Sequence, residues 1–158
     1  MPRLAGWLLL AVLVIVLDQA SKAWVVASIP LHGGFEVTGF FNMVFVFNYG
    51  AAFSFLSGAG GWQRWFFTLL ALAISVWIIL LLRRHAHEHL QPAALALILG
   101  GAIGNIADRL QHGAVVDFLD FHYAGWHFWA FNLADSAITL GVMLLLLHQI
   151  TYKESAHD

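Results

Sequence analysis

The chain of 158 residues is 61% hydrophobic and only 10% charged, whereas ordinary soluble domains carry about 25% charged residues. This composition excludes a typical soluble globule and predicts an integral membrane protein with room for one domain. The net charge of −2 provides no basic surface for nucleic acid. The sequence has no cysteine, which excludes disulfides, thiolate catalysis and zinc-finger spacing.

Four segments are apolar enough to cross a bilayer as helices, which takes roughly 20 residues each. In chain order they are about residues 4–26, 62–82, 91–107 and 133–150. We expect one bundle and a single integral membrane domain over residues 1–158. Residues 1–29 could alternatively be a cleavable signal peptide, but the sequence DQASK continues the helix and no clear small-x-small cleavage site follows it.

The connections between these spans differ in character. Roughly 35 residues separate the first two spans, too many for a tight helical hairpin, and they include the Phe- and Val-rich stretch FEVTGFFNMVFVFNYGAAFSF. This stretch predicts a small β-element over about residues 35–55, lying against the membrane surface. The next connection is short and polar. Its HAHEH sequence, His85–His89, could ligate a metal, but we interpret it as a solvated turn.

The distribution of charge indicates an orientation. One end of a four-helix bundle would hold both termini and the basic residues Arg3, Arg83, Arg84 and Lys153. The other end would hold Lys22, Arg64 and Arg109. Two of these, Lys22 and Arg109, have an acid nearby in sequence and look like site residues rather than topology signals. The positive-inside rule then predicts cytoplasmic termini and long loops outside.

Polar residues recur at helical spacing near that outer end. Asp18 and Lys22 are four residues apart and share one helix face, as a structural ion pair would. On the third span, Asn105 and Arg109 are also four apart, with Asp108 on the adjacent ridge. The nearby glycines at four-residue spacing are explained by close helix packing. Packing does not explain the amide and the guanidinium, which could place donors beside a neighbouring carboxylate.

Two further carboxylates stand out, Asp117 in GAVVDFLDF and Asp135 at the start of the last span. Asp135 could simply complete a capping box with Asn132, and Asp117 could be a loop acid paired with Arg109. If the two carboxylates converge instead, they share one proton and one apparent pKa rises. Such a pair can activate water and protonate a leaving amine, which is aspartic-protease chemistry.

Two other classes of protein remain open at this stage. Intramembrane acids with a lysine and an arginine could form a proton relay in a small transporter or channel subunit, and the chain could also be a purely structural membrane subunit. The relay is disfavoured because the polar residues cluster at one membrane face, while the middles of the second and fourth spans hold no charge.

Five motifs occur in one order along the chain: DQASK, NYGAAFSF, GNIADR, VVDF and FNLADSAI. Together they resemble bacterial lipoprotein signal peptidase, also called signal peptidase II, from Asp18 to about Gly141. The resemblance implies an intramembrane aspartyl protease of the bacterial inner membrane without a cofactor. Such enzymes cut the signal peptide from prolipoproteins on the amino side of a cysteine that already carries diacylglycerol.

The resemblance also assigns roles to residues. The catalytic dyad falls on Asp117 and Asp135, and Asp18 with Lys22 matches a structural first-helix motif. The supporting polar residues are Asn48, Asn105, Asp108, Arg109 and Asn132. The implied fold is an all-α membrane protein with four transmembrane helices, a periplasmic β-cradle near residues 35–55 and a mobile periplasmic helix near residues 54–62.

The family pattern carries further expectations. We expect a monomer in contact with membrane lipids, open to inhibition by the cyclic peptide globomycin. Two departures, Tyr49 where the family often has Thr and Trp129 where it often has Pro, leave loop stiffness and substrate fit in question. The helix N-terminus at Asp135 favours its ionised form, so we expect Asp117 to carry the shared proton.

Overall fold

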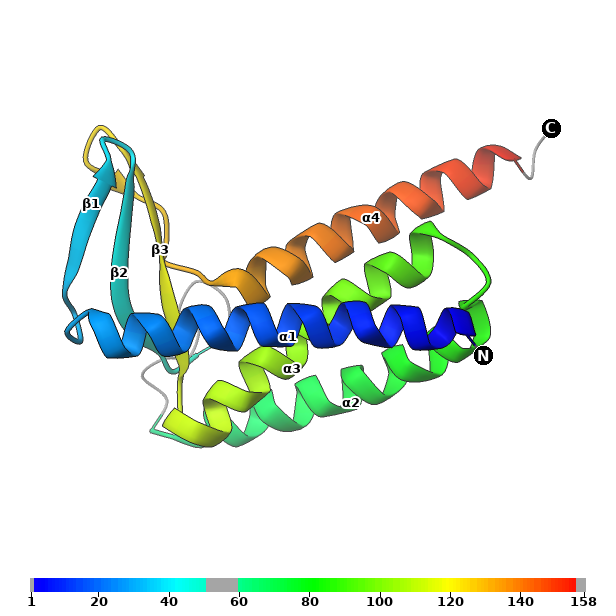
Figure 1. Ribbon diagram of the computed structural model, residues 1–158, viewed down its shortest axis with the longest axis horizontal. Helices are drawn as coiled ribbons and strands as arrows, with labels where there is room; N and C mark the ends of the chain where they lie inside the picture. Colours follow the sequence, from blue (N-terminus) through cyan, green and yellow to red (C-terminus); the bar gives the residue numbers. More distant parts are fainter. Residues whose placement is uncertain (1, 51–59, 156–158) are drawn as a thin grey trace.

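The computed structural model describes residues 2–50 and 60–155 of the chain. Four long helices dominate it (Figure 1). They are α1 (Pro2–Ser28), α2 (Gln63–His85), α3 (Leu90–His112) and α4 (Leu133–Ser155). Each is long and apolar enough to cross a membrane, so the prediction of four apolar helices is confirmed.

The third helix is longer than its apolar run of about residues 91–107. It continues to His112, so Asp108 and Arg109 are helical, and it ends at Gly113. Gly113 has a positive φ of 79° and its N–H bonds to the Arg109 carbonyl oxygen, a left-handed helix cap that glycine adopts without steric cost. The chain then turns directly into a strand.

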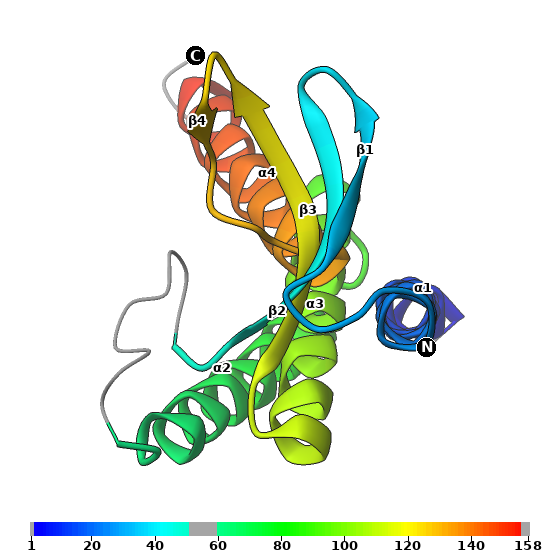
Figure 2. The same ribbon diagram turned by 90° about the vertical axis from the view of Figure 1, so that its left-hand side faces the viewer.

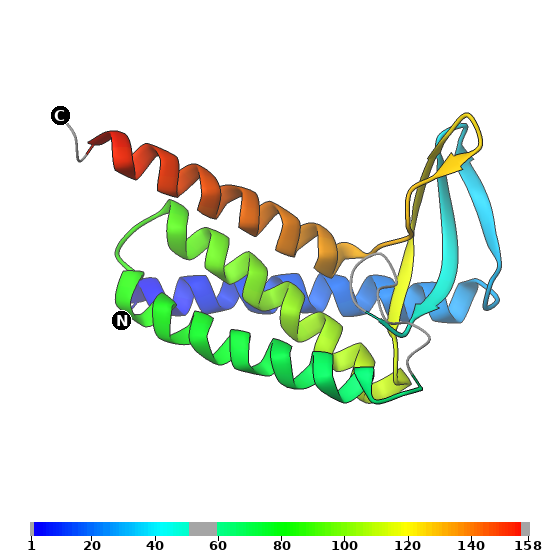
Figure 3. The ribbon, with the colours of Figure 1, turned by 180° about the vertical axis from the view of Figure 1, so that it is seen from behind.

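The bundle is built around α3, which packs against α1, α2 and α4 (Figures 1 and 3). Because α2 and α4 lie on different sides of α3, they do not close against each other. Small residues allow the close approaches. A Cβ at Gly100 would meet the Ala11 carbonyl oxygen of α1, and a Cβ at Gly101 would collide with the Ala134 carbonyl oxygen of α4. This is the small-residue packing that membrane helices use.

A four-stranded antiparallel sheet sits across one end of the bundle (Figure 2). Its order is β1 (Gly34–Thr38), β2 (Phe41–Asn48), β3 (Val115–Tyr123) and β4 (Trp126–His127). The small antiparallel sheet is confirmed, and β1 and β2 fall in the predicted segment. The other two strands come from the connection between α3 and α4, which was not predicted to be strand.

Parts of the predicted outer structure fall outside the described residues. These are residues 51–55 of the predicted β-element and residues 54–59 of the periplasmic helix expected near residues 54–62. Residues 60–62 form a turn that leads into α2. The sheet is anchored on the last turns of α1 by an apolar cluster of Val25, Ile29, Phe45, Val116 and Phe118. Both termini lie at the opposite end of the bundle (Figure 3).

Candidate active site

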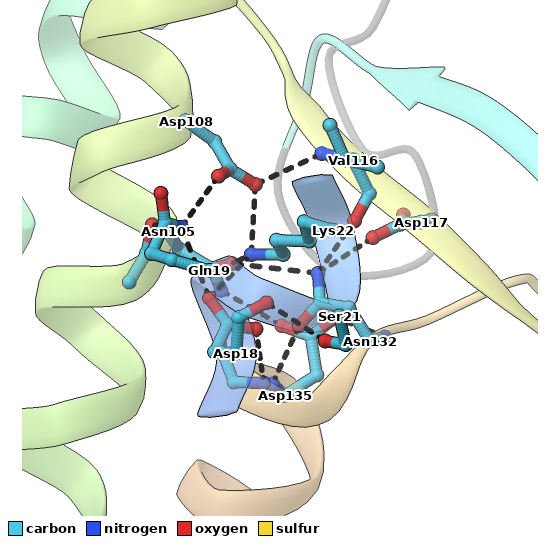
Figure 4. A network of polar contacts seen from close by, with 12 residues as sticks. Asp18, Gln19, Ser21, Lys22, Asn105, Asp108, Val116, Asp117, Asn132 and Asp135 are labelled. Carbon is cyan, nitrogen blue, oxygen red and sulfur yellow. Dashed lines mark hydrogen bonds and ion pairs between the residues drawn. The ribbon is translucent and has the colours of Figure 1, made fainter. Parts of the chain in front are cut away.

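Asp117 and Asp135 come from different elements, β3 and the first turn of α4, and meet at Asn132 (Figure 4). The Asn132 Nδ2 group donates to Asp117 Oδ1 at 2.8 Å. Its Oδ1 accepts from the Asp135 backbone N–H at 2.9 Å, and its own N–H donates to Asp135 Oδ2 at 3.3 Å. The capping box suggested by the sequence is therefore present, and the same asparagine also holds the second carboxylate.

Neutral amides supply the other hydrogen bonds to these carboxylates. Asn48, at the end of β2, donates to Asp117 Oδ2 at 3.0 Å, and Asn105 of α3 donates to Asp135 Oδ1 at 2.9 Å. Asn48 pairs with Val115 of β3, which lies two residues before Asp117 and on the same face of the strand. This pairing brings Asn48 within reach of Asp117. Within the described residues, neither carboxylate forms an ion pair.

This environment keeps Asp117 protonated at higher pH than usual. The pKa of Asp117 is raised from 3.8 to about 7, first by burial and then by the neighbouring Asp135 charge, which together outweigh the opposing effect of the amide bonds from Asn48 and Asn132. A carboxyl group buried beside a second carboxylate, with only neutral donors, retains its proton near neutrality. The pair can thus offer one protonated and one ionised carboxyl group.

Behind the pair lies a second polar cluster centred on Lys22 (Figure 4). Lys22 Nζ lies 2.9 Å from Asp18 Oδ2, 2.7 Å from Asp108 Oδ2 and 3.0 Å from Asn105 Oδ1. The pair that the first-helix spacing suggests is therefore present, with Asp108 added from α3. Gln19 also enters this cluster, donating to Asp108 at 2.8 Å and to the Gly104 carbonyl oxygen at 3.1 Å.

Arg109 does not pair with Asp117, as the loop interpretation of that acid would require. Its guanidinium donates to the Gly50 carbonyl oxygen at 3.2 Å and lies 5.6 Å from the centre of the Phe67 ring. Arg109 is buried and ties the end of β2 to α3 and α2. The carboxyl groups of Asp135, Asp108 and Asp117 all interact electrostatically with this cation without forming an ion pair within the described residues.

A cavity of about 730 Å³ opens beside Asp135 in the gap between α2 and α4. Its polar end is formed by Asn48, Asn105, Arg109 and Asp135. Its walls are apolar and include Phe67, Leu70, Ile74, Ile98, Ile138 and Met143. Trp129, one of the two departures from the family pattern, also lines it. An apolar chain segment can occupy such a space and present its end to the carboxylates.

Sequence reasoning missed Gln19 and Gly104 as parts of the site. Gln19 belongs to DQASK, and a polar side chain next to Asp18 inside an apolar span was an available signal. Position 104 has room only for glycine, since a Cβ there would collide with the Asp18 carboxylate.

The HAHEH sequence at the other end of the bundle was considered as a metal site. Within the described residues, no three His, Asp or Glu side chains are grouped as a metal site would require.

The fold and this site define a polytopic membrane protein with a buried polar centre at one end of its helical bundle. The chain belongs to the signal peptidase II family, whose model, described as "Signal peptidase (SPase) II", matches residues 10–151. It is therefore a member of a family of proteases, as the five motifs predicted.

Individual relatives agree with this assignment. The lipoprotein signal peptidase of Azoarcus sp. (strain BH72) is 60% identical over 91% of this chain and 82% of the relative. That of Burkholderia multivorans is 53% identical over 93% and 89%. Two solved structures of bacterial membrane enzymes are also similar. One has a TM-score of 0.86 at 31% identity, over 96% of this chain and 91% of the other. The second has a TM-score of 0.80 at 33% identity, over 92% of each.

Proposed function

We propose that the protein is an intramembrane aspartyl endopeptidase that removes the signal peptide from prolipoproteins carrying a diacylglyceryl-modified cysteine, cutting on the amino side of that cysteine. The relatives' name, lipoprotein signal peptidase, supports the substrate class. One observation carries the mechanism: Asp117 and Asp135, from separate elements, converge on Asn132 beside an apolar cavity.

In the proposed mechanism a water molecule sits between the two carboxyl groups. Ionised Asp135 takes a proton from the water while the water oxygen attacks the scissile carbonyl carbon. Protonated Asp117 gives its proton to the carbonyl oxygen. The tetrahedral intermediate then collapses. The C–N bond breaks, Asp135 passes its proton to the leaving amine, and the hydroxyl returns a proton to Asp117. The raised pKa of Asp117, about 7, supports its role as the proton carrier.

The surrounding residues have supporting roles in this proposal. Asn48, Asn105 and Asn132 orient the carboxylates without neutralising them, because amides carry no charge. Arg109, at the polar end of the cavity, is placed to bind the substrate backbone. The apolar walls between α2 and α4 would accept the hydrophobic signal peptide, and globomycin-type inhibitors would compete for the same space. The proposed reaction uses only carboxyl groups and water, and both carboxyl groups come from the same chain, so we propose that it acts as a monomer.

We also propose that the protein lies in the bacterial inner membrane with both termini cytoplasmic and the sheet periplasmic. Exposed Arg83 and Arg84 end α2 on the side of the bundle that holds the termini. Lys22 and Arg109, on the opposite side, are buried in the polar cluster. They therefore do not act as topology signals, and the remaining basic residues favour this orientation. A lipid-anchored substrate would then meet the carboxylates at the outer membrane surface.

A cleavage assay with matched aspartate variants tests this proposal. Purified protein in detergent is incubated with a diacylglyceryl-modified prolipoprotein, and shortening is followed by mass. Asp117→Asn and Asp135→Asn should fold normally and lose on the order of 10³-fold in rate or more. Asp120→Asn is the control, since Asp120 lies on the same strand but binds His127 and Asn42 instead; it should cleave normally. Substantial cleavage by either dyad variant, or processing of an unlipidated precursor at equal rate, would contradict the proposal.

A further inference from the structure

Lys22 is a buried and fully bonded charged group in the site, yet it contacts neither Asp117 nor Asp135. An ammonium group has three N–H donors, and Lys22 directs them at three acceptors: Asp18, Asp108 and Asn105. Its side chain is only 3% exposed. Such a group could be a purely structural ion pair, so its importance depends on what the three acceptors hold in turn.

Two of the acceptors hold the backbone next to the proposed dyad. Asp108 accepts from the Val116 N–H at 3.0 Å, and Val116 immediately precedes Asp117. Asp18 accepts from the Ala134 N–H at 2.9 Å, and Ala134 immediately precedes Asp135. Each carboxylate uses one oxygen to contact Lys22. The position of each dyad residue along its own element is therefore tied to the same ammonium group.

The third acceptor, Asn105, touches the dyad through its side chain. Its Oδ1 accepts from Lys22, and its Nδ2 donates to Asp135 Oδ1. This orientation of the amide follows from chemistry, because the lysine can only donate and an ionised carboxylate can only accept. The flipped amide would set an NH₂ group against the ammonium and an oxygen against the carboxylate. The other donor to Asn105 Oδ1, Asn132 Nδ2, is more distant at 3.4 Å.

We propose that Lys22 is a positioning residue for the dyad: one buried ammonium group fixes the backbone before Asp117, the backbone before Asp135 and the amide that bonds Asp135. This inference rests on the proposed function, since it takes those two aspartates as the reacting groups. A positioning residue differs from a structural ion pair in what it changes. A structural ion pair would determine the fraction of protein that folds but not the kcat of the folded protein.

The test is a double-mutant cycle on purified, detergent-solubilised protein, with Lys22→Met, Asn105→Ala and the double variant. The folded fraction is measured by thermal unfolding, and kcat and KM are measured with the lipidated prolipoprotein. Folded Lys22→Met should lose roughly 100-fold in kcat with KM nearly unchanged, as expected when reacting groups are displaced by about 1 Å. The double variant should lose clearly less than the product of the two single losses, because part of the lysine's effect passes through the amide.

A pH–rate profile supplies a readout that a structural role would not move. The groups facing Asp117 are Asn48, Asn132, Asp135 and Lys22, and the Lys22 charge lowers the pKa of Asp117. Removing that charge should shift the alkaline limb of the profile to higher pH. Arg84→Met, which removes an exposed cation at the far end of the bundle, is the matched control and should leave kcat and the profile unchanged.

Three results would overturn the inference: a wild-type kcat in folded Lys22→Met, a double variant whose loss equals the product of the single losses, or an unmoved profile. If Lys22→Met does not fold because Asp18 and Asp108 are left unpaired, the same measurements are made after adding Asp18→Asn and Asp108→Asn. That triple variant removes the unpaired charges but still lacks the donor to Asn105. A wild-type kcat in the triple variant would therefore also overturn the inference. Failure of the proposed function looks different, because Asp117→Asn or Asp135→Asn would then still cleave.

Discussion

The two ends of the helical bundle are held together in contrasting ways. Near the termini, α1, α2 and α3 pack mainly through apolar side chains, Ala11, Ile78, Leu82, Leu95, Ala96 and Leu99, with a hydrogen bond from Trp7 Nε1 to the Ala86 carbonyl oxygen at their edge. Near the sheet, α1, α3 and α4 meet through buried charges and amides centred on Lys22 and Asn132. The same helices α1 and α3 take part in both ends.

The difference shows which end determines function. Inside a bilayer, apolar surfaces gain little by leaving lipid for one another, so the apolar end relies on close packing, which tolerates substitution of similar volume. Hydrogen bonds at the polar end are directional and place individual atoms. We therefore expect changes at the polar end to alter rate or pH response, and changes at the apolar end to alter stability alone.

The largest expected effect concerns Asp117 and pH. Folding raises its pKa from 3.8 to about 7, so between these values the folded state holds a proton that the unfolded chain has released. Stability must then fall as pH rises through this window, by up to roughly 4 kcal/mol. Asp117→Asn carries no such proton and should gain stability relative to wild type between pH 4 and pH 8, measured by thermal unfolding. A constant difference from wild type across that range would show that Asp117 is not buried as described.

Asn132→Ser separates capping from catalysis at the polar end. Serine is also a good N-cap and can accept from the Asp135 N–H, so helix α4 should keep its stability. It is too short to reproduce the 2.8 Å bond to Asp117. Cleavage should fall on the order of 10²–10³-fold, as when one oriented donor is removed from an active site. The measurement is kcat of the folded fraction alongside the melting temperature. A lowered melting temperature with an unchanged kcat would assign Asn132 to stability alone.

Leu82→Ala tests the apolar end. Leu82 is fully buried among α1 and α3 side chains, and its truncation leaves a cavity that should cost roughly 2–3 kcal/mol. Folded protein should cleave at the wild-type rate with an unchanged pH profile. Leu146→Ala, on an exposed position of α4, should leave both stability and rate unchanged. A rate loss in folded Leu82→Ala would break the distinction between the two ends.

The smallest effect is expected at the link between α4 and the α2–α3 turn. His148 Nε2 lies 3.6 Å from Glu88 Oε2, and the glutamate is 43% exposed. Exposed pairs of this kind contribute between 0 and about 1 kcal/mol. Glu88→Gln should therefore shift the melting temperature only slightly, and less at high salt. A loss of several degrees would indicate that the end holding the termini also depends on polar contacts.

The spans and the polar residues were predictable because each has a local signature. Apolar runs identify the helices, and ionisable groups within them mark a site. The pairing of β2 with β3 was not predictable in the same way. Residues 115–123 form a short apolar run whose partner lies about 70 residues earlier, and no local pattern identifies a partner at that distance. Only this pairing brings Asn48 within 3.0 Å of Asp117.

The second role of Asp18 was hidden for a related reason. Four-residue spacing identified its contact with Lys22, but each carboxylate has two oxygens. Asp18 Oδ2 contacts Lys22, and Asp18 Oδ1 accepts from the Ala134 N–H, 116 residues further along the chain. Likewise Asn132 looked like a helix cap and is one, but no local pattern indicates that its side-chain NH₂ group donates to Asp117.

The contact between Asp18 and Ala134 joins the first helix to the last, and this has a consequence for biosynthesis. A ribosome makes α1 first and α4 at the very end, so a growing chain with three spans inserted has Asp117 but no Asp135. Under the proposed mechanism such a nascent or prematurely terminated product is inert. Proteolytic competence arrives in a single late event, when the newest segment docks onto the oldest.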